Sequence, residues 1–136
     1  MTVINNSVVD AYFNLASEEY LLEHSHDDIF MLWRNDRSVI VGKNQNTYSE
    51  VDTEYIRKSG IKVVRRLTGG GAVFHDPGNV NFTFITDADE GGLDFGRFTA
   101  PVIAALRKMG VPAEADGRND ITANGCKISG NAQCVY

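Results

Sequence analysis

The sequence predicts an α+β domain in which a mixed, mainly antiparallel sheet is flanked by helices. Two observations carry this prediction: short β-rich runs are interrupted by segments of helical periodicity, and turn signals separate several of the apolar runs. The length of 136 residues, of which 43% are hydrophobic, is that of one domain with a buried core. We therefore treat residues 1–136 as belonging to one domain.

The composition argues against several classes of protein. Thirteen basic and 18 acidic residues give a net charge of −5, whereas a nucleic-acid or membrane-surface protein needs a basic face. No run approaches the roughly 20 apolar residues of a membrane span, and the first residues lack the pattern of a signal peptide. The two cysteines and three histidines match neither a disulfide framework nor a zinc set, so we expect free, buried thiols. These features predict a cytoplasmic protein that acts on small molecules or a protein partner.

Three segments have the periodicity and the capping residues of helices. The first follows Asn14 as N-cap and ends in a polar run. The second opens at Ser49, with acidic residues in its first turn, and closes at Gly60. The third is expected to run from Thr99 as N-cap to a stop at Gly110. Its apolar face comprises Val102, Leu106 and Met109.

The β-rich runs divide the chain between these helices. Residues 28–34 and 38–42 are expected to be central strands joined by a turn, because the first is apolar on both faces. Residues 61–67 form a strand that leads into three glycines. Residues 72–75 and 79–85 are expected to pair as a hairpin, with a type II turn formed by the Asp-Pro-Gly-Asn sequence between them.

A second hairpin is expected around the turn Asn124-Gly125. This turn fixes four cross-strand pairs: Ala123 with Cys126, Thr122 with Lys127, Ile121 with Ile128, and Asp120 with Ser129. Since side chains alternate along a strand, it also predicts a polar face and a core face. The polar face comprises Asp120, Thr122, Lys127 and Ser129, and the core face comprises Ile121, Ala123, Cys126 and Ile128.

The register makes Asp120 and Lys127 diagonal neighbours on the polar face, roughly 7 Å apart. Two interpretations stay open at this point. Both side chains are within reach of one ligand, or they form a surface ion pair that contributes about 0–1 kcal/mol.

Gly69, Gly70 and Gly71 form the most unusual stretch of the sequence. A tight turn alone would explain such a run. However, Arg66 is close by, and the spacing fits neither a P-loop nor a dinucleotide fingerprint. Glycine allows close backbone approach, and arginine offers a planar fork to a carboxylate or phosphate. The combination suits a site where a carboxylic acid is joined to a nucleotide.

Three stretches resemble the lipoate–protein ligase family: "RRLTGGGAVFHDPGNVNFTFI" at 65–85, "GRND" at 117–120 and "KISGNAQ" at 127–133. The segments "YFNLASEEYLLE" and "WRNDRSVIVGKNQN" are similar to the amino-terminal region of the same family. The resemblance covers nearly the whole chain, and the motifs follow the family's order. It implies the catalytic-domain type shared by biotin and lipoyl protein ligases, here as its amino-terminal part.

The resemblance also implies an activity. The family uses ATP and Mg²⁺ to activate lipoate or octanoate as an acyl-adenylate, and then transfers the acyl group to a lysine of a lipoyl carrier. Such carriers are the lipoyl domains of 2-oxoacid dehydrogenase acyltransferases and the glycine cleavage H protein. Nucleic acid and membrane are not expected partners.

The family's site residues carry over onto matching positions of this sequence. Lys127 matches the lysine at the reacting centre, and Asp120 matches an aspartate near the phosphate and magnesium. His75 is assigned to binding or structure rather than to catalysis. Together with Asp120, the expected lipoate and adenylate contacts are Arg66, Thr68, Gly69, Gly70, Gly71, Val73, Phe74, His75, Asn79, Ser129, Gly130 and Ala132.

The chain departs from the family at its end. Residues 133–136 look like part of a strand, whereas the family continues with a further strand and more helices. The sequence is therefore expected to be a truncated form, a fragment or one half of a split enzyme, which needs a complementing carboxy-terminal segment or chain.

Two other functions stay open. One is a cysteine-dependent octanoyl or lipoyl transferase on the same fold, which uses no ATP. The other is a non-catalytic lipoate-binding protein, although an intact Lys127 argues against it.

Overall fold

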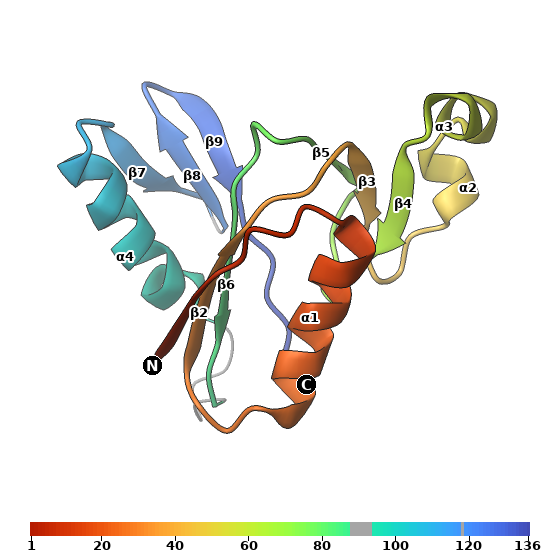
Figure 1. The fold of residues 1–136 in the computed structure, drawn as a ribbon. Coiled ribbons are helices and arrows are strands. Elements are labelled where there is room, and N and C mark those ends of the chain that lie inside the picture. Colours follow the sequence, from red (N-terminus) through yellow and green to blue (C-terminus); the bar gives the residue numbers. More distant parts are fainter. Residues whose placement is uncertain (88–93, 118) are drawn as a thin grey trace. The chain divides into compact units, whose positions relative to one another are not determined.

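The structure is a computed structural model that describes residues 1–87, 94–117 and 119–136 (Figure 1). It divides into two compact units, the first comprising Met1–Asp87 with Tyr136 and the second Ala88–Val135. Within the described residues, the strands form three sheets of three strands each. Two strand pairs are parallel and four are antiparallel. The expected mixed, mainly antiparallel α+β architecture is confirmed, but as three small sheets instead of one.

One sheet of the first unit has the order β1-β2-β6. Its strands are β1 (Thr2–Asn5), β2 (Ile29–Trp33) and β6 (Asn81–Ile85). Strand β2 pairs parallel with β1 and antiparallel with β6. The expectation that β2 is a central strand is therefore correct. One face of this strand is buried and consists of Ile29, Met31 and Trp33.

The other sheet of the first unit has the order β4-β3-β5. Its strands are β3 (Ser38–Val41), β4 (Lys62–Arg65) and β5 (Val73–His75). Strand β3 lies in the centre, as expected, pairing parallel with β4 and antiparallel with β5. The expected hairpin between β5 and β6 is wrong, because these two strands pair in different sheets.

The turn between β5 and β6 also differs from the expectation. Asn79 N–H donates to the Asp76 carbonyl over 2.9 Å, which closes a four-residue turn with Pro77 at its second position. Gly78 is not among the glycines with positive φ, so the turn is not type II. The Asp76 carboxylate instead accepts from Gly78 N–H over 2.8 Å, an Asx contact that stabilises the turn locally.

Helix α1 (Ala11–His24) packs against both sheets of the first unit, since it contacts β4 and β6. Ala11 and Leu15 join a core cluster with residues of β2 and β3. The helix begins four residues earlier than expected, because Asp10 is its N-cap and accepts from Phe13 N–H over 2.9 Å. Hydrogen bonding between Asp10 and Lys62 lowers the pKa of the Asp10 carboxyl and reinforces this start. Asn14 is inside the helix and completely buried, so its expected role as N-cap is wrong.

The expected second helix is two helices, α2 (Thr47–Glu50) and α3 (Thr53–Ser59). The chain is extended at Val51, and the Asp52 carboxylate starts α3 afresh by accepting from two backbone N–H groups. The end is as expected: Gly60 adopts φ of 63°, the left-handed conformation that glycine allows.

The second unit contains helix α4 (Phe95–Lys108) and the sheet β7-β8-β9. The helix starts earlier than expected, since Asp94 is the N-cap, and Thr99 lies buried in its second turn. Gly110, with φ of 86°, follows the helix as predicted. Met109, expected in the core, is 78% exposed, and Ile103 instead packs into the core of this unit.

The three strands of the second unit are β7 (Ala113–Asp116), β8 (Asp120–Ala123) and β9 (Cys126–Gly130). The predicted turn between β8 and β9 is confirmed, with positive φ at both Asn124 and Gly125. Next to it, Thr122 pairs with Lys127 and Ala123 with Cys126, as predicted.

A β-bulge then shifts the register of this hairpin by one residue. Ile121 pairs with Ser129 instead of Ile128, and Asp120 pairs with Gly130 instead of Ser129. A bulge places two residues of one strand opposite one of the other, so the side-chain alternation breaks. Only part of the predicted core face is therefore buried. Of its members, Ile121 is buried, Ala123 is half-buried, and Cys126 and Ile128 are exposed; Thr122, expected on the polar face, is buried.

Both cysteine thiols are exposed, so the expectation that they are buried is wrong. Residues 131–136 belong to no strand, in contrast to the expectation for 133–136.

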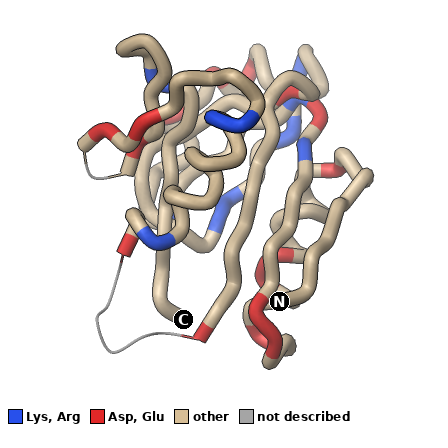
Figure 2. The backbone as a smooth tube through the Cα atoms, turned by 90° about the vertical axis from the view of Figure 1, so that its left-hand side faces the viewer, with Lys and Arg blue, Asp and Glu red and all other residues tan. Residues whose placement is uncertain are grey.

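Basic positions lie scattered among acidic ones along the described backbone (Figure 2). None of the helices in the described part of the chain has the length and apolar character needed to cross a bilayer.

We predict that Ile121→Ala destabilises the protein by about 2–5 kcal/mol, because it opens a cavity in the core of the second unit. Ile128→Ala removes the same atoms from a side chain that is 47% exposed, and serves as the matched control. Urea unfolding of both variants measures the two free energies. Equal losses would show that the bulge does not turn Ile128 away from the core.

Candidate functional site

Arg65, the last residue of β4, organises the loop that follows β3. Its guanidinium donates to the carbonyls of Gly42 and Gln45, each over 2.8 Å, and to the carbonyl of Lys43 over 3.2 Å. It also donates to Thr47 Oγ1 over 2.8 Å, at the start of α2. One side chain thus satisfies four acceptors of a loop that has little regular structure of its own.

Arg66 organises the loop of Thr68, Gly69, Gly70 and Gly71, which we call the glycine loop. Its guanidinium donates to the carbonyls of Gly69 (2.7 Å) and Gly71 (2.8 Å), to Thr68 Oγ1 (3.1 Å) and to the Ile40 carbonyl (3.2 Å). Burial of this side chain lowers its pKa, although an arginine stays charged. Four of the five N–H groups are engaged in these bonds. The arginine expected to hold a ligand anion therefore shapes the loop itself.

The three glycines of this loop are not equivalent. Gly70 has φ of 100°, a backbone conformation that residues with a side chain rarely adopt. A β-carbon at Gly69 or Gly71 would meet no atom within 4 Å, so neither glycine is needed by the protein's own packing. Open space beside both backbones is what close approach of a ligand requires.

Gly42 is a further glycine of the site that the sequence analysis missed. A β-carbon there would lie 2.0 Å from the Gly70 carbonyl oxygen, a distance at which the backbone must move. The end of β3 therefore touches the glycine loop directly. The sequence carried one signal for this contact, a glycine directly after the β-rich run 38–41.

Strand β5 follows the glycine loop, and its three side chains differ in burial. His75 is buried, whereas Val73 and Phe74 are about half exposed. Phe74 lies opposite Val39 and, with Tyr55 of α3, lines a shallow pocket beside that helix. His75 and Phe74 thus belong to opposite faces of the sheet, although both are expected ligand contacts.

His75 is held by a side-chain amide. Its Nδ1 lies 3.1 Å from Asn35 Nδ2, and its ring meets the Trp33 ring edge-on. Burial, followed by the positive charge of Arg66, lowers the pKa of His75 below its ordinary value. The ring is therefore neutral at pH 7.

A carboxyl on α1 belongs to the same unit and was also missed. Glu18 is hydrogen bonded by Thr83 Oγ1, which in turn accepts from Trp33 Nε1 over 2.9 Å. Burial raises the pKa of Glu18, and the bond from Thr83 opposes this shift only in part. The sequence gave no signal for this residue, because Glu18 is one of three glutamates in the helix.

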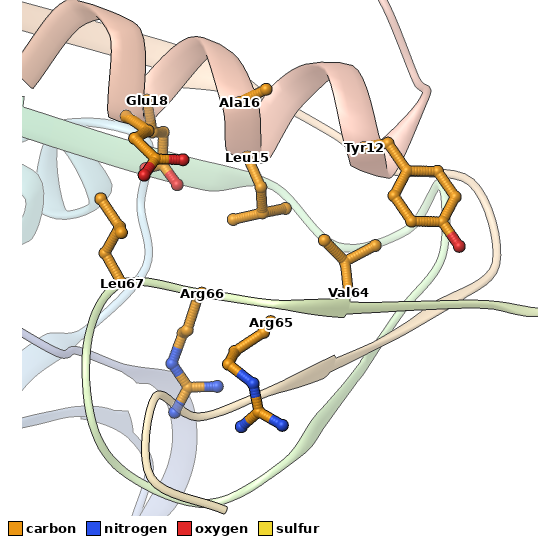
Figure 3. A pocket seen from close by; sticks show the side chains of 9 residues that line it. Tyr12, Leu15, Ala16, Glu18, Val64, Arg65, Arg66 and Leu67 are labelled. Atoms are coloured by element: carbon orange, nitrogen blue, oxygen red, sulfur yellow. The ribbon is translucent and has the colours of Figure 1, made fainter.

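Glu18 lines a pocket of about 180 Å³ between α1 and the segment 64–67. In Figure 3, Leu15 and Val64 face each other across this pocket, and Leu67 points to the Glu18 side. Arg65 and Arg66 leave the same segment in the direction away from α1. The segment therefore presents apolar side chains to the helix and both guanidinium groups to the loops.

Asn79 is placed in the turn that joins β5 to β6. Its amide donates to Asn81 Oδ1 over 2.9 Å, and Asn81 lies on β6 opposite Trp33. The amide nitrogen of Asn81 is buried and has no hydrogen-bond partner within the described residues.

In the second unit, Lys127 and Asp120 form an ion pair with 2.9 Å between Nζ and Oδ1. The two side chains are therefore in contact, as an ion pair that is partly exposed, although the bulge places Gly130 and not Ser129 opposite Asp120. Gly130 makes room for it: a β-carbon at this position would lie 3.1 Å from both Cε and Nζ of Lys127. The lysine side chain therefore lies over a residue without a side chain, with its ammonium paired with one carboxylate.

Two reciprocal hydrogen bonds join the segments on either side of this ion pair. Asn119 Nδ2 donates to the Asn131 carbonyl over 2.8 Å, and Asn131 Nδ2 donates to the Asn119 carbonyl over 2.7 Å. Ser129 Oγ lies 3.5 Å from Asn131 Oδ1, and Ala132 is exposed. The sequence motifs contained both asparagines, but the sequence analysis assigned them no role. Arg118 of the same motif lies outside the described residues.

The predicted site residues therefore fall into two sets. The first unit brings together Arg66, Thr68, Gly69, Gly70, Gly71, Val73 and His75 in one loop and strand, with Phe74 on the other face and Asn79 in the next turn. The second unit brings together Asp120, Lys127 and Gly130, with Ser129 and Ala132 following in the same segment.

Comparison with known proteins identifies relatives of the whole chain. Lipoate-protein ligase LplJ of Bacillus subtilis is 52% identical over 132 residues, which are 95% of this chain and 40% of that protein. The chain thus spans about 40% of the length of this curated relative.

Solved structures agree with this result. Plasmodium falciparum LipL1 in complex with lipoate matches 95% of this chain and 42% of that one, with 37% identity and a TM-score of 0.86. A bipartite lipoate protein ligase of Thermoplasma acidophilum, studied with its E2 lipoyl domain, matches 99% of this chain and 56% of its own, with 31% identity and a TM-score of 0.87. Lipoate-protein ligase A bound with ATP matches 100% of this chain and 62% of its own, with 31% identity and a TM-score of 0.85.

The family model for the lipoyl protein ligase A/B catalytic domain matches residues 10–136. The glycine loop held by Arg66 and the Lys127–Asp120 pair both lie within this range, and the chain belongs to the lipoyl protein ligase A/B catalytic-domain family.

Proposed function

We propose that the protein containing this chain activates lipoate or octanoate with ATP as an acyl-adenylate and transfers the acyl group to a lysine of a lipoyl carrier domain. The observation that carries this proposal is the Lys127 ammonium, which Asp120 holds over the bare backbone of Gly130. The names of the relatives support it, since one ligase structure contains lipoate and another ATP.

Lys127 has the chemistry that adenylate formation needs. The lipoate carboxylate attacks the α-phosphate of ATP, and negative charge grows on the phosphate and on the leaving pyrophosphate. A preorganised ammonium stabilises this charge as it develops. Its pairing with Asp120 fixes its position, and its side chain is still 58% exposed and so accessible to a ligand.

The glycine loop is proposed to bind the reacting groups. Arg66 bonds to the carbonyls of Gly69 and Gly71 and so constrains the backbone of the loop before a ligand arrives. The open space at these two glycines leaves room for a phosphate or carboxylate directly against the backbone. Thr68, Val73, Phe74, His75, Asn79, Ser129 and Ala132 stay proposed contacts of the lipoyl or adenylate groups.

Mg²⁺ fits this arrangement as a partner of ATP. The described residues contain no group of three or more His, Cys, Asp or Glu side chains that would hold a metal. Magnesium at nucleotide sites is commonly held by substrate phosphates with one or two carboxylates. Asp120 would supply such a carboxylate, and the ion would neutralise charge on the phosphates.

The proposed acceptors are lipoyl domains of 2-oxoacid dehydrogenase acyltransferases and the glycine cleavage H protein. The bipartite ligase of Thermoplasma acidophilum, studied with an E2 lipoyl domain, supports this class of partner. A cytoplasmic location and a complementing carboxy-terminal segment or chain complete the proposal.

Lipoate-dependent exchange of pyrophosphate into ATP tests the activity. We predict that Lys127→Ala lowers this exchange by about two to three orders of magnitude, the scale for one preorganised charge stabiliser. Lys58→Ala is the matched control, since Lys58 also forms an exposed ion pair, with Glu54. Normal exchange in Lys127→Ala would remove this lysine from the mechanism. Acyl transfer without any exchange would instead favour the cysteine-dependent transferase.

We predict that Gly71→Ala leaves the melting temperature within about 2 °C of the wild-type value but abolishes binding of lipoyl-adenylate. The new methyl group meets no protein atom, so only a ligand would collide with it. Gly42→Ala is the contrasting variant, because its β-carbon would collide with the Gly70 carbonyl oxygen. This substitution should lower both the melting temperature and the affinity for lipoyl-adenylate. Calorimetry with lipoyl-adenylate reads out the affinity, and unaltered affinity in Gly71→Ala would exclude close approach at this residue.

A further inference from the structure

Four buried or half-buried polar side chains of the first unit form one hydrogen-bonded chain from the amino-terminal segment to His75. Asn6 Nδ2 lies 2.9 Å from Asn14 Oδ1, and Asn14 Nδ2 lies 2.9 Å from Asn35 Oδ1. Asn35 Nδ2 lies 3.1 Å from His75 Nδ1. Asn14 and Asn35 are completely buried and His75 is 8% exposed. Amides buried at this depth need their hydrogen bonds satisfied.

Backbone groups at both ends of Asn14 fix the direction of every amide in this chain. Asn14 Nδ2 also contacts the carbonyls of Val8 and Arg34, each at 2.9 Å, and carbonyls can only accept. At the other end, Asn6 Oδ1 accepts from Val8 N–H over 3.0 Å, which turns the Asn6 NH₂ group to Asn14 Oδ1. Two independent anchors thus give Asn14 the same orientation, with Nδ2 facing Asn35.

The orientation of Asn14 determines the state of His75. Asn14 Nδ2 has two hydrogens for three acceptors, so one hydrogen is shared between two of them. An amide nitrogen cannot accept, so an Asn35 nitrogen in this place would face it donor to donor, and the Asn35 atom is therefore Oδ1. Asn35 Nδ2 then faces the ring and can only donate, so His75 Nδ1 must accept. A neutral imidazole that accepts at Nδ1 carries its proton on Nε2.

His75 Nε2 makes no hydrogen bond with any described residue, and it is not among their enclosed unpartnered polar atoms. The proton fixed by the amide chain is therefore on the ring atom that is still available. His75 follows the glycine loop in sequence, with Val73 and Phe74 between them, and Arg66 is near enough to affect its titration.

We propose that Asn35 is a positioning residue that holds His75 as the Nε2–H tautomer, so that His75 offers the ligand a hydrogen-bond donor and no base. The contribution to ligand binding rests on the proposed adenylate-forming function, whereas the tautomer rests on the amide chain alone. An acyl-adenylate presents phosphate and carbonyl oxygens, which accept hydrogen bonds. A donor at Nε2 suits these atoms, and a lone pair there would repel them.

The tautomer can be read directly from the unmodified protein. Nitrogen-15 NMR of the intact protein, labelled at histidine and compared with His75→Gln for assignment, separates protonated from unprotonated ring nitrogens. We expect Nδ1 of His75 to be unprotonated and Nε2 protonated at pH 7. The opposite pattern, or a mixture of both tautomers, would overturn the proposal without any change at Asn35.

Asn35→Asp tests whether Asn35 sets this state. The variant keeps the size of the side chain but replaces the donor with an acceptor, so a proton should move to His75 Nδ1. We expect formation of lipoyl-adenylate from lipoate and ATP to fall about tenfold, the scale of one lost hydrogen bond. Asn5→Asp adds the same charge at an exposed position of β1 and is the control.

The outcomes separate the positioning role of Asn35 from the proposed adenylate-forming function. Retention of the Nε2–H tautomer in Asn35→Asp, or a changed tautomer with unchanged adenylate formation, would contradict the positioning role. If the unmodified protein shows the expected tautomer but forms no lipoyl-adenylate, the proposed function fails and the tautomer assignment is confirmed.

Discussion

The bonds from Arg66 to the carbonyls of Gly69 and Gly71 are the constraint on which the rest of the first unit's site depends. A glycine loop has the largest conformational entropy to lose, and two charge-assisted bonds from one planar group offset part of that loss. Arg65 does the same for the preceding loop. Two adjacent arginines at the end of β4 therefore position two loops that are distant in sequence, and the loops meet where Gly42 touches Gly70.

The same principle operates in the second unit with other groups. Here Asp120 holds the Lys127 ammonium, Gly130 leaves room for it, and the paired amides of Asn119 and Asn131 fix the ends of the segment. In both units a charged side chain lies against a glycine backbone and is held by polar partners before any ligand is present. Preorganisation of this kind lowers the cost of binding and of stabilising charge in a reaction.

Sequence reasoning was most reliable where one residue pair determines local geometry. The dipeptide Asn124-Gly125 predicted the turn and the Thr122–Lys127 pair correctly, because few dipeptides tolerate positive φ at both residues. Sequence reasoning failed where the pairing of a strand depends on residues that are far away in the sequence. The bulge between Ile121 and Thr122 depends on the two strands as a pair, and the separation of β5 from β6 depends on their partners β3 and β2. Arg66 was identified as a site residue, but its bonds to its own loop follow only from the folded backbone.

Amide hydrogen exchange in Arg66→Lys tests most directly whether Arg66 fixes the glycine loop. Lysine keeps the charge but not the planar fork, so it cannot span the carbonyls of Gly69 and Gly71. Lys43 N–H donates to the Thr68 carbonyl and reports on that loop, whereas Gln45 N–H donates to the Gly42 carbonyl and reports on the loop held by Arg65. We predict faster exchange at Lys43 and an unchanged rate at Gln45, with Arg65→Lys accelerating Gln45. An unchanged rate at Lys43 in Arg66→Lys would contradict the account.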